Sequence, residues 1–218
     1  MLLLRPFGVY EPQADTWLLA RALRLRGGLR GARLLDLCTG TGALALAAAR
    51  AGARTTAVDI SLRSAAAARL NAVLHRLPLR VICGDLTDPV AGETFDVILA
   101  NPPYVVRTKG EPAPHSRARA WDAGPDGRAA VDRICTAAPR LLAPGGTLLM
   151  VHSALCGVDT TLAVLRRAGL AAAVVDRQTE PFGPVMQART AELEACGVID
   201  AGAHDEELVV IRADRIRR

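Results

Sequence analysis

The stretch Phe95-Asp-Val-Ile-Leu-Ala-Asn-Pro-Pro-Tyr104 joins an apolar run to two consecutive prolines. Its segment Val97–Ala100 is typical of a strand that is buried on both faces, and the prolines cannot continue a hydrogen-bonded ladder. The chain is therefore expected to leave the sheet at Asn101. In an open α/β sheet, ligands bind at the edge where such strands end, so Asn101–Tyr104 is a candidate site.

Strand and helix patterns alternate on either side of this stretch. Strands are expected at 33–37, 54–59, 79–83, 147–151, 171–175 and 207–211, and helices at 15–26, 42–51, 61–76, 128–142 and 158–168. This alternation predicts an α/β fold with about seven strands in a mostly parallel sheet and helices on both faces. Asp15 and Ser61 are the expected N-caps of their helices, Pro144–Gly146 is expected to be a turn, and Thr179–Asp205 has no firm assignment.

Composition limits the classes of protein that fit. The chain has 218 residues, half of them apolar, which suits one well-buried core better than two domains. Its net charge of +5 comes from arginines that are spread along the chain, a pattern that indicates a solvated surface more than a nucleic-acid face. The five cysteines form no C-x-x-C pair, and no charge-free apolar stretch of about 18 residues occurs. A cytoplasmic protein with reduced thiols, no metal site and no membrane span is expected.

The loop Asp36-Leu-Cys-Thr-Gly-Thr-Gly42 follows the first predicted central strand. Gly40 and Gly42 would let a ligand approach the backbone closely. A dinucleotide fingerprint would need glycines at Cys38 and Ala43, so a pyrophosphate cofactor is disfavoured. The loop therefore predicts a nucleotide-like ligand of another kind.

Acidic residues end three consecutive predicted strands, at Asp36, Asp59 and Asp85. Asp59 can accept both hydroxyls of a ribose, and Asp85 with its neighbour Leu86 can meet an adenine amino group. Asp36 is placed to face the amino-acid part of such a cofactor. An acidic rim of this kind would repel phosphate, which again disfavours a pyrophosphate.

The tetrapeptide Asn101–Tyr104 carries the predicted chemistry. The side-chain carbonyl of Asn101 and the backbone carbonyl of Pro102 can accept both N–H bonds of one NH2 group, draw its nitrogen toward pyramidal geometry and aim its lone pair for in-line displacement. Tyr104 can pack against the planar acceptor group, or it can serve only to anchor the loop, and Pro103 completes the predicted substrate contact. Asn101, Pro102 and Tyr104 are thus the predicted catalytic residues for methyl transfer to a planar nitrogen.

Several of these segments resemble one family. Asp36–Gly42, Asp59, Gly84-Asp85 and Asn101–Tyr104 look like class I methyltransferases that use S-adenosylmethionine, and more narrowly like HemK/PrmC-type protein-glutamine N5 methyltransferases. The segment Gly8–Thr16 is similar to the Val-Tyr-Glu-Pro segment of the short HemK-like branch. Trp121–Gly127 is similar to that family's glycine-containing loop.

The resemblance implies a single Rossmann-like domain over 1–218, in which 1–32 forms part of the cofactor site and 105–127 forms an active-site loop. It implies S-adenosylmethionine as the cofactor and S-adenosylhomocysteine as the product. The implied cofactor contacts are Thr16, Asp36, Cys38 through its backbone, Gly40, Gly42, Asp59, Asp85, Leu86 and Asn101. The implied acceptor is a glutamine amide nitrogen of a protein such as a translation release factor, and some relatives also require a small zinc-binding activator subunit.

Two other functions stay open at this point. The same tetrapeptide chemistry serves an exocyclic amino group, so N6-adenine methylation of RNA or DNA is the alternative activity. Enzymes that grip bases use stacking residues and a positive track, whereas this chain is 3% aromatic. The intact Asn101–Tyr104 segment argues against a noncatalytic cofactor-binding partner of another enzyme.

Overall fold

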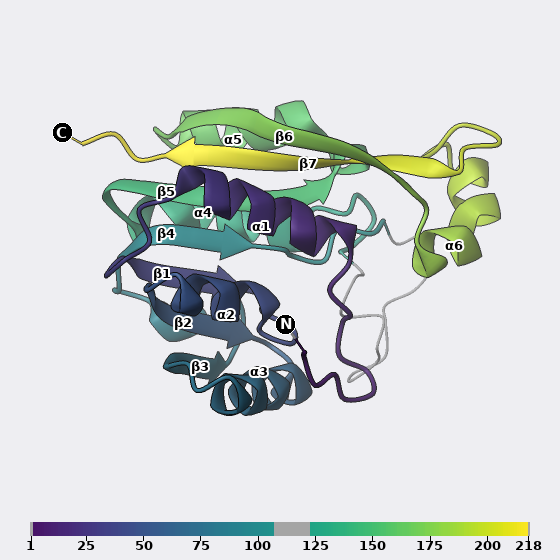
Figure 1. Cartoon of the computed structure of the whole chain (residues 1–218). Coiled ribbons are helices and arrows are strands. Elements are labelled where there is room, and N and C mark those ends of the chain that lie inside the picture. The colour runs from purple at the N-terminus through teal and green to yellow at the C-terminus, as the bar shows by residue number, and fades with distance from the viewer. Residues whose placement is uncertain (1, 107–122, 218) are drawn as a thin grey trace.

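A computed structural model describes residues 2–106 and 123–217 of the chain. Within them lies a seven-stranded sheet with the order β3-β2-β1-β4-β5-β7-β6 (Figure 1). The strands are β1 (Arg33–Leu37), β2 (Arg54–Asp59), β3 (Leu79–Cys83), β4 (Phe95–Ala100), β5 (Leu142–Ser153), β6 (Ala171–Pro181) and β7 (Asp205–Asp214). The pairings among β1 to β5 are parallel, and β7 is antiparallel to both of its neighbours. The predicted α/β class with a mostly parallel sheet is confirmed.

Helices cover both faces of this sheet (Figure 1). One face carries α1 (Ala14–Arg26) and α2 (Ala43–Arg50), with α3 (Leu62–Leu74) beside them, and the other carries α4 (Ala129–Leu141) and α5 (Val158–Arg167). Successive side chains in a strand point to opposite faces. Leu34 accordingly packs in the core beneath α1, while its neighbour Leu35 packs in the core beneath α4, and both are fully buried. This double burial explains the unbroken apolar run Val97–Ala100 in the central strand β4.

The structure corrects several predicted boundaries. Asp15 is not the N-cap of α1, because the helix already begins at Ala14 and Gln13 holds the N-cap position without a side-chain cap bond. The Asp15 carboxylate instead accepts hydrogen bonds from two tyrosine hydroxyls. Ser61 does cap α3, where its hydroxyl accepts a 3.3 Å hydrogen bond from the Ser64 amide. The predicted turn at Pro144–Gly146 lies inside β5 as a bulge, since Leu142 pairs with Phe95 and Thr147 already pairs with Val97.

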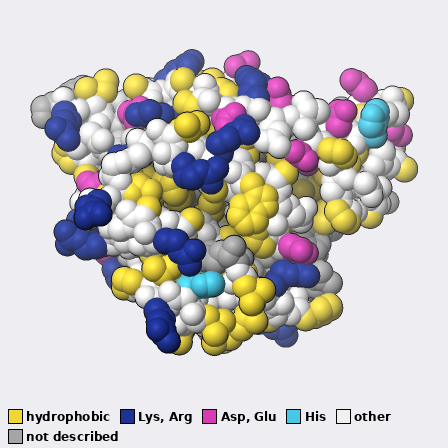
Figure 2. Space-filling model, in the orientation of Figure 1, with side chains coloured by type: hydrophobic (Ala, Val, Ile, Leu, Met, Phe, Trp, Pro, Cys, Tyr) yellow, Lys and Arg dark blue, Asp and Glu magenta, His cyan; other side chains and the backbone are white. Residues whose placement is uncertain are grey.

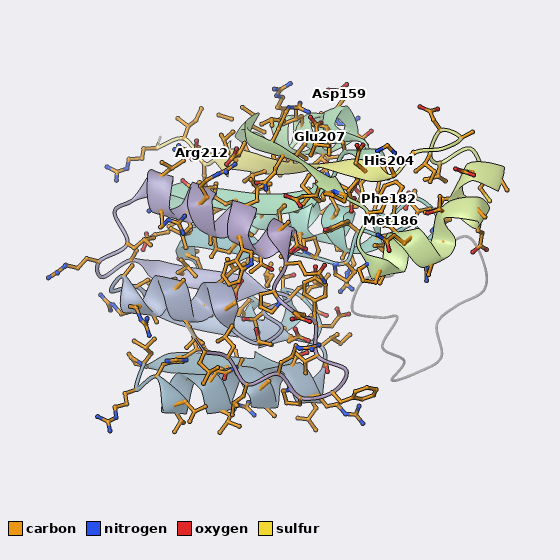
Figure 3. All side chains as sticks on the ribbon, turned by 45° about the vertical axis from the view of Figure 1, so that its right-hand side comes forward. Asp159, Phe182, Met186, His204, Glu207 and Arg212 are labelled. Carbon is orange, nitrogen blue, oxygen red and sulfur yellow. The ribbon has the colours of Figure 1, made fainter. Side chains whose placement is uncertain are left out.

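The segment left unassigned from the sequence is largely ordered structure. Strand β6 continues to Pro181, well past the predicted end at Val175, and α6 (Pro184–Ala195) follows it before β7. Met186 and Leu193 of α6 pack with Val105, Val106, Phe182 and Ile199 in a small separate core. Figure 3 shows Phe182 and Met186 close together where α6 begins. Helix α6 is thereby fixed against the chain that leaves β4.

Surface charge is dispersed over the face seen in Figure 2, where Lys and Arg side chains lie in separate groups among acidic and apolar ones. Two short 3-10 helices, η1 (Asp88–Val90) and η3 (Ala154–Cys156), follow β3 and β5. Among the described residues, no helix combines the length and the apolar character needed to cross a membrane.

Candidate active site

A hollow of about 270 Å³ that is open to solvent lies over the carboxyl ends of β1 and β4. It is lined by Tyr10, Pro12, Thr16, Cys38, Thr39, Gly40, Thr41, Ala43, Leu44 and Asn101. Of the predicted cofactor residues, Thr16, Cys38, Gly40 and Asn101 are brought together here. The N-terminal segment contributes Tyr10, Pro12 and Thr16 to the lining, although these residues precede the sheet in sequence.

The glycines of the loop after β1 have different surroundings. Cys38, Gly40 and Gly42 all have positive φ, at 59°, 57° and 84°. A Cβ on Gly40 would meet no atom within 4 Å, whereas a Cβ on Gly42 would come within 3.1 Å of the Cβ of Ala68 in α3. Gly40 therefore leaves open space at the hollow, while Gly42 allows α2 and α3 to pack closely. Cys38 adopts a conformation that glycine takes more easily.

Asp36 lies beneath this loop and is fully buried. Its Oδ2 accepts hydrogen bonds from the Thr39 hydroxyl at 2.5 Å and from the Ala45 amide at 3.1 Å. Burial raises the pKa of Asp36 to about 7, although both hydrogen bonds oppose that shift. Among the described residues its Oδ1 is buried with no hydrogen-bond partner. Asp36 thus holds the loop to the start of α2 and keeps one acceptor atom unused.

Asp59 and Asp85, the other two acidic residues at strand ends, have different surroundings from Asp36. The Asp59 carboxylate accepts hydrogen bonds from the amides of Gly40 at 2.9 Å and Ser61 at 2.8 Å, which tie it to the loop. Burial raises the pKa of Asp59. Asp85 is half-exposed and pairs with Arg133 of α4 at 2.9 Å, and the adjacent Leu86, with φ 44°, packs against the main core. Asp85 and Leu86 lie at the end of β3 without lining the hollow.

Asn101 is connected to α1 by a chain of hydrogen bonds. Its Nδ2 donates to the Thr16 hydroxyl oxygen at 3.3 Å, and that hydroxyl donates to Asp15 Oδ1 at 3.1 Å. The hydroxyls of Tyr10 and Tyr104 both donate to Asp15 Oδ2, at 2.8 and 3.1 Å. Because the amide nitrogen of Asn101 is turned to Thr16, its Oδ1 remains available as an acceptor.

The backbone of the tetrapeptide is held from the opposite side. The Tyr104 carbonyl oxygen accepts a 3.1 Å hydrogen bond from the Cys156 thiol. A Cβ on Gly127 would approach that same oxygen to 2.6 Å, so glycine is required there. Arg128 is buried and donates to the carbonyl oxygens of Cys156 and Gly157, which fixes the segment that carries the thiol. Within the tetrapeptide, Pro102 is buried and Pro103 is partly exposed.

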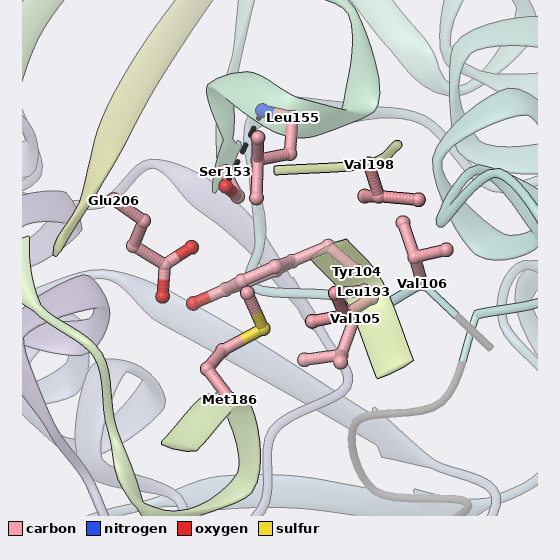
Figure 4. A pocket seen from close by; sticks show the side chains of 9 residues that line it. All are labelled: Tyr104, Val105, Val106, Ser153, Leu155, Met186, Leu193, Val198 and Glu206. Atoms are coloured by element: carbon pink, nitrogen blue, oxygen red, sulfur yellow. Dashed lines mark hydrogen bonds between the residues drawn. The ribbon is translucent and has the colours of Figure 1, made fainter. Parts of the chain in front are cut away.

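A second, smaller hollow lies beside Tyr104 (Figure 4). Its lining consists of Tyr104, Val105, Val106, Ser153, Leu155, Met186, Leu193, Val198 and Glu206. Figure 4 shows the carboxyl group of Glu206 directed toward the Tyr104 hydroxyl, with apolar side chains around the ring. Burial raises the pKa of Glu206, while a hydrogen bond with the Ser153 side chain lowers it. Asn101 and Tyr104 thus connect the two hollows within one tetrapeptide.

Some residues at the site were not assigned from the sequence. Tyr10 belongs to the Gly8–Thr16 segment that carries the family resemblance, but nothing in its own spacing predicted a contact with Asp15. Glu206 immediately precedes the predicted last strand, and no sequence pattern indicated that it would lie at the site. Most of the predicted loop 105–127, including Trp121, lies outside the described residues.

The arrangement of a glycine-containing loop after β1 and an Asn-Pro-Pro-Tyr segment after β4 in this sheet defines a class I methyltransferase. The model of the methyltransferase small domain family matches residues 7–116, and the chain belongs to that family. The predicted resemblance to HemK/PrmC-type methyltransferases is confirmed by relatives. A Methanocaldococcus jannaschii protein provisionally named as a protein N5-glutamine methyltransferase is 33% identical, over 82% of this chain and 89% of the relative.

Two further relatives show the range of acceptors named within this group. The release factor glutamine methyltransferase of Bordetella pertussis is 38% identical over 74% of this chain and 63% of its own length. The 4-amino-L-phenylalanine/4-methylamino-L-phenylalanine methyltransferase of Streptomyces pristinaespiralis is 34% identical over 66% of this chain and 54% of its own length. This chain therefore spans somewhat less than two thirds of both relatives.

Solved structures agree with the fold. The E. cuniculi Mtq2-Trm112 complex, described as responsible for methylation of the eRF1 termination factor, matches with a TM-score of 0.66 at 22% identity, over 96% of this chain and 99% of that one. A T. thermophilus 16S rRNA N2 G1207 methyltransferase in complex with AdoMet and guanosine matches with a TM-score of 0.58 at 23% identity, over 97% of this chain and 45% of that one. At these identities the likeness shows a shared fold.

Proposed function

We propose that this protein transfers a methyl group from S-adenosylmethionine to the side-chain amide nitrogen of a glutamine in a protein, with a translation release factor as the candidate substrate. The observation that carries this proposal is the orientation of Asn101, whose amide nitrogen faces Thr16 while its oxygen is left to accept. The names of the glutamine methyltransferase relatives support the type of acceptor.

The residues around the first hollow fit the cofactor. Asp36 keeps a buried oxygen without a partner among the described residues, which suits an ammonium group, and Gly40 leaves space where a Cβ would project. The Asp59 carboxylate is held by two backbone amides and keeps lone pairs for ribose hydroxyls. When bound, S-adenosylmethionine would supply an electrophilic methyl group on a sulfonium. Thr16, Cys38 and Asn101 complete the proposed contacts.

The chain's own contribution to the reaction is positioning. Asn101 Oδ1 and the Pro102 carbonyl would accept the two N–H bonds of the glutamine amide, so that the nitrogen lone pair is fixed toward the methyl donor. The Tyr104 ring, three residues after Asn101, would pack against the planar amide.

The first experiment is methyl transfer from radiolabelled S-adenosylmethionine to three acceptors: a release factor from the same organism, total RNA, and 4-amino-L-phenylalanine. Label in the release factor that disappears when its acceptor glutamine, located by mass spectrometry, is replaced by alanine is the expected result. Label in RNA alone would support adenine methylation, and label in the amino acid alone would place the activity with the Streptomyces relative. Asn101→Ala protein is the control for enzyme-dependent label.

We also propose that a small second subunit adds to the β3 edge of the sheet. In the described structure β3 has a neighbour on one side only, and apolar residues near it are exposed: Ile60, Leu62, Val73 and Leu74. The partner chain of the Mtq2-Trm112 neighbour supports this role for a second protein. Hydrogen exchange should show new protection of Leu79–Cys83 when the copurified partner is added, and unchanged exchange there would refute the docking edge.

A further inference from the structure

We propose that Asp15 is a positioning residue that acts through Thr16 to fix the Asn101 carboxamide in the orientation that accepts N–H groups. This inference rests on the proposed function, because it concerns how the acceptor amide is held. It gives Asp15 a role other than helix capping. The carboxylate does not line the cofactor hollow, and it touches the tetrapeptide only through side chains.

The Asp15 carboxylate is saturated by donors. It is 3% exposed. Its Oδ1 accepts from the Thr16 amide at 2.5 Å and from the Thr16 hydroxyl at 3.1 Å, and its Oδ2 accepts from Tyr10 and Tyr104. An ionised carboxylate is an acceptor only. The Thr16 hydroxyl therefore donates its proton to Asp15, and its oxygen accepts the hydrogen bond from Asn101.

The hydrogen bond from Thr16 to Asp15 determines which end of the Asn101 amide faces α1. The NH2 and C=O groups of a carboxamide have similar size but opposite hydrogen-bonding character. With the Thr16 proton directed to Asp15, Thr16 can receive the NH2 group but cannot donate to the oxygen. The Asn101 oxygen is thereby left for the acceptor substrate. A flipped amide would present its own NH2 to the NH2 of the substrate, and no hydrogen bond could form between them.

The two tyrosines keep Asp15 in place. Burial and the nearby negative charge of Asp15 raise the pKa of both Tyr10 and Tyr104, so both hydroxyls remain protonated donors. Tyr104 belongs to the same tetrapeptide as Asn101, while Tyr10 comes from the N-terminal segment. The carboxylate is therefore fixed from two sides relative to the group that it orients.

The decisive test is a double-mutant cycle between Thr16 and Asn101. Thr16→Val keeps the shape of the side chain but removes its hydroxyl, and Thr16→Ser keeps the hydroxyl. At saturating S-adenosylmethionine, Thr16→Val should lower kcat about tenfold, which is the loss expected for one orienting hydrogen bond. Thr16→Ser, which keeps the hydroxyl, should lose clearly less kcat than Thr16→Val. In an Asn101→Ala background, Thr16→Val should have no further effect on kcat. If Thr16→Val lowers kcat by the same factor in the Asn101→Ala background as in the wild type, the two residues act independently and the proposal is wrong.

Asp15→Asn is a second test, at a residue that does not itself line the cofactor hollow, although its partners Tyr10 and Thr16 do. We expect kcat to fall while the Kd for S-adenosylmethionine, measured by calorimetry, stays within about twofold of the wild type, since Asp15 acts on the acceptor side. A loss of cofactor affinity as large as the loss in kcat would refute this role. Thr179→Val makes the same substitution as Thr16→Val at an exposed position of β6. It is the matched control for that variant and should change neither kcat nor the Kd for S-adenosylmethionine.

The cycle separates the inference from the proposed function. If wild-type protein methylates an acceptor other than glutamine and depends on Asn101, the cycle is run on that acceptor, so the proposed substrate fails while the positioning role is still decided. If Asn101→Ala retains full kcat on every acceptor, both the proposed function and the inference fail. If glutamine is methylated and Thr16→Val equals the wild type, only the inference fails.

Discussion

The hydroxyl of Tyr104 donates a 3.1 Å hydrogen bond to the carboxylate of Asp15, although 89 positions separate the two residues. This contact joins the segment after β4 to the first turn of α1. The N-terminal segment is thus part of the site and not only a cover for the sheet. A substitution that displaces Asp15 should therefore also displace Tyr104, and the reverse.

Asn101→Ala should lower kcat on the order of 100-fold or more, because a preorganised acceptor at the reacting group is removed. Binding of S-adenosylmethionine, measured by calorimetry, should change much less, since nine other residues line the hollow. Asn101→Asp is the informative companion, because it keeps the shape but cannot donate to Thr16. Normal turnover by the alanine variant would remove Asn101 from the catalytic assignment.

Tyr104→Phe should separate the hydroxyl of this residue from its ring. The variant keeps the ring but removes one of the donors to Asp15, so we expect a loss of about 1 kcal/mol in the free energy of unfolding. For a chain of this size that corresponds to a decrease in Tm of roughly 2–4 °C. Differential scanning calorimetry measures the change. Tyr104→Ala should also raise the KM for the acceptor, and an unchanged KM would exclude packing against the substrate.

Gly40→Ala and Gly42→Ala form a matched pair in the loop after β1. Both positions have positive φ, so each substitution carries a backbone cost of about 1 kcal/mol. Gly42→Ala adds a clash at 3.1 Å with Ala68, whereas the new methyl group at Gly40 meets no atom within 4 Å. Urea denaturation should show the larger destabilisation for Gly42→Ala. Gly40→Ala should mainly weaken cofactor binding, and the reverse order would contradict the assignment of the two glycines.

Asp36 should make the stability of the protein depend on pH. Its folded-state pKa, about 7, lies above the ordinary value of 3.8 because burial disfavours the charge. The stability from this group is therefore complete below about pH 4 and is lost as pH rises through 7, with a slope of at most about 1.4 kcal/mol per pH unit. Denaturation of wild type and Asp36→Asn at pH 5 and pH 8 tests this. The difference in unfolding free energy between the two proteins should shift in favour of Asp36→Asn at pH 8, and a pH-independent difference would refute it.

Much of the fold was predictable because the central strands are buried on both faces. The mainly apolar sequences of β1 and β4, together with Gly40, Gly42 and the prolines after Asn101, give strong local signals. The end of β6 was missed because it is an edge strand with alternating exposed side chains, among them the charged Arg177, and such a segment lacks an apolar run.

The relationships that complete the site could not be predicted from local sequence. Asp15 in the first turn of a helix is a typical capping residue, and only tertiary packing brings Tyr10 and Tyr104 to its carboxylate. Glu206 reaches the second hollow because β7 enters the sheet between β5 and β6, which is a pairing between distant segments. The surroundings of Asp15 and the position of Glu206 both depend on contacts between distant segments, which residue spacing does not predict.

The position of β7 also has a consequence for biosynthesis. Ribosomes deliver β5 and β6 before Asp205–Asp214, yet these two strands meet only through β7. During translation, the edges of β5 and β6 that pair with β7 must therefore stay unpaired until β7 emerges. Unpaired edges are sites of intermolecular pairing, so the interval before β7 is made is the period in which a chaperone would protect this protein most.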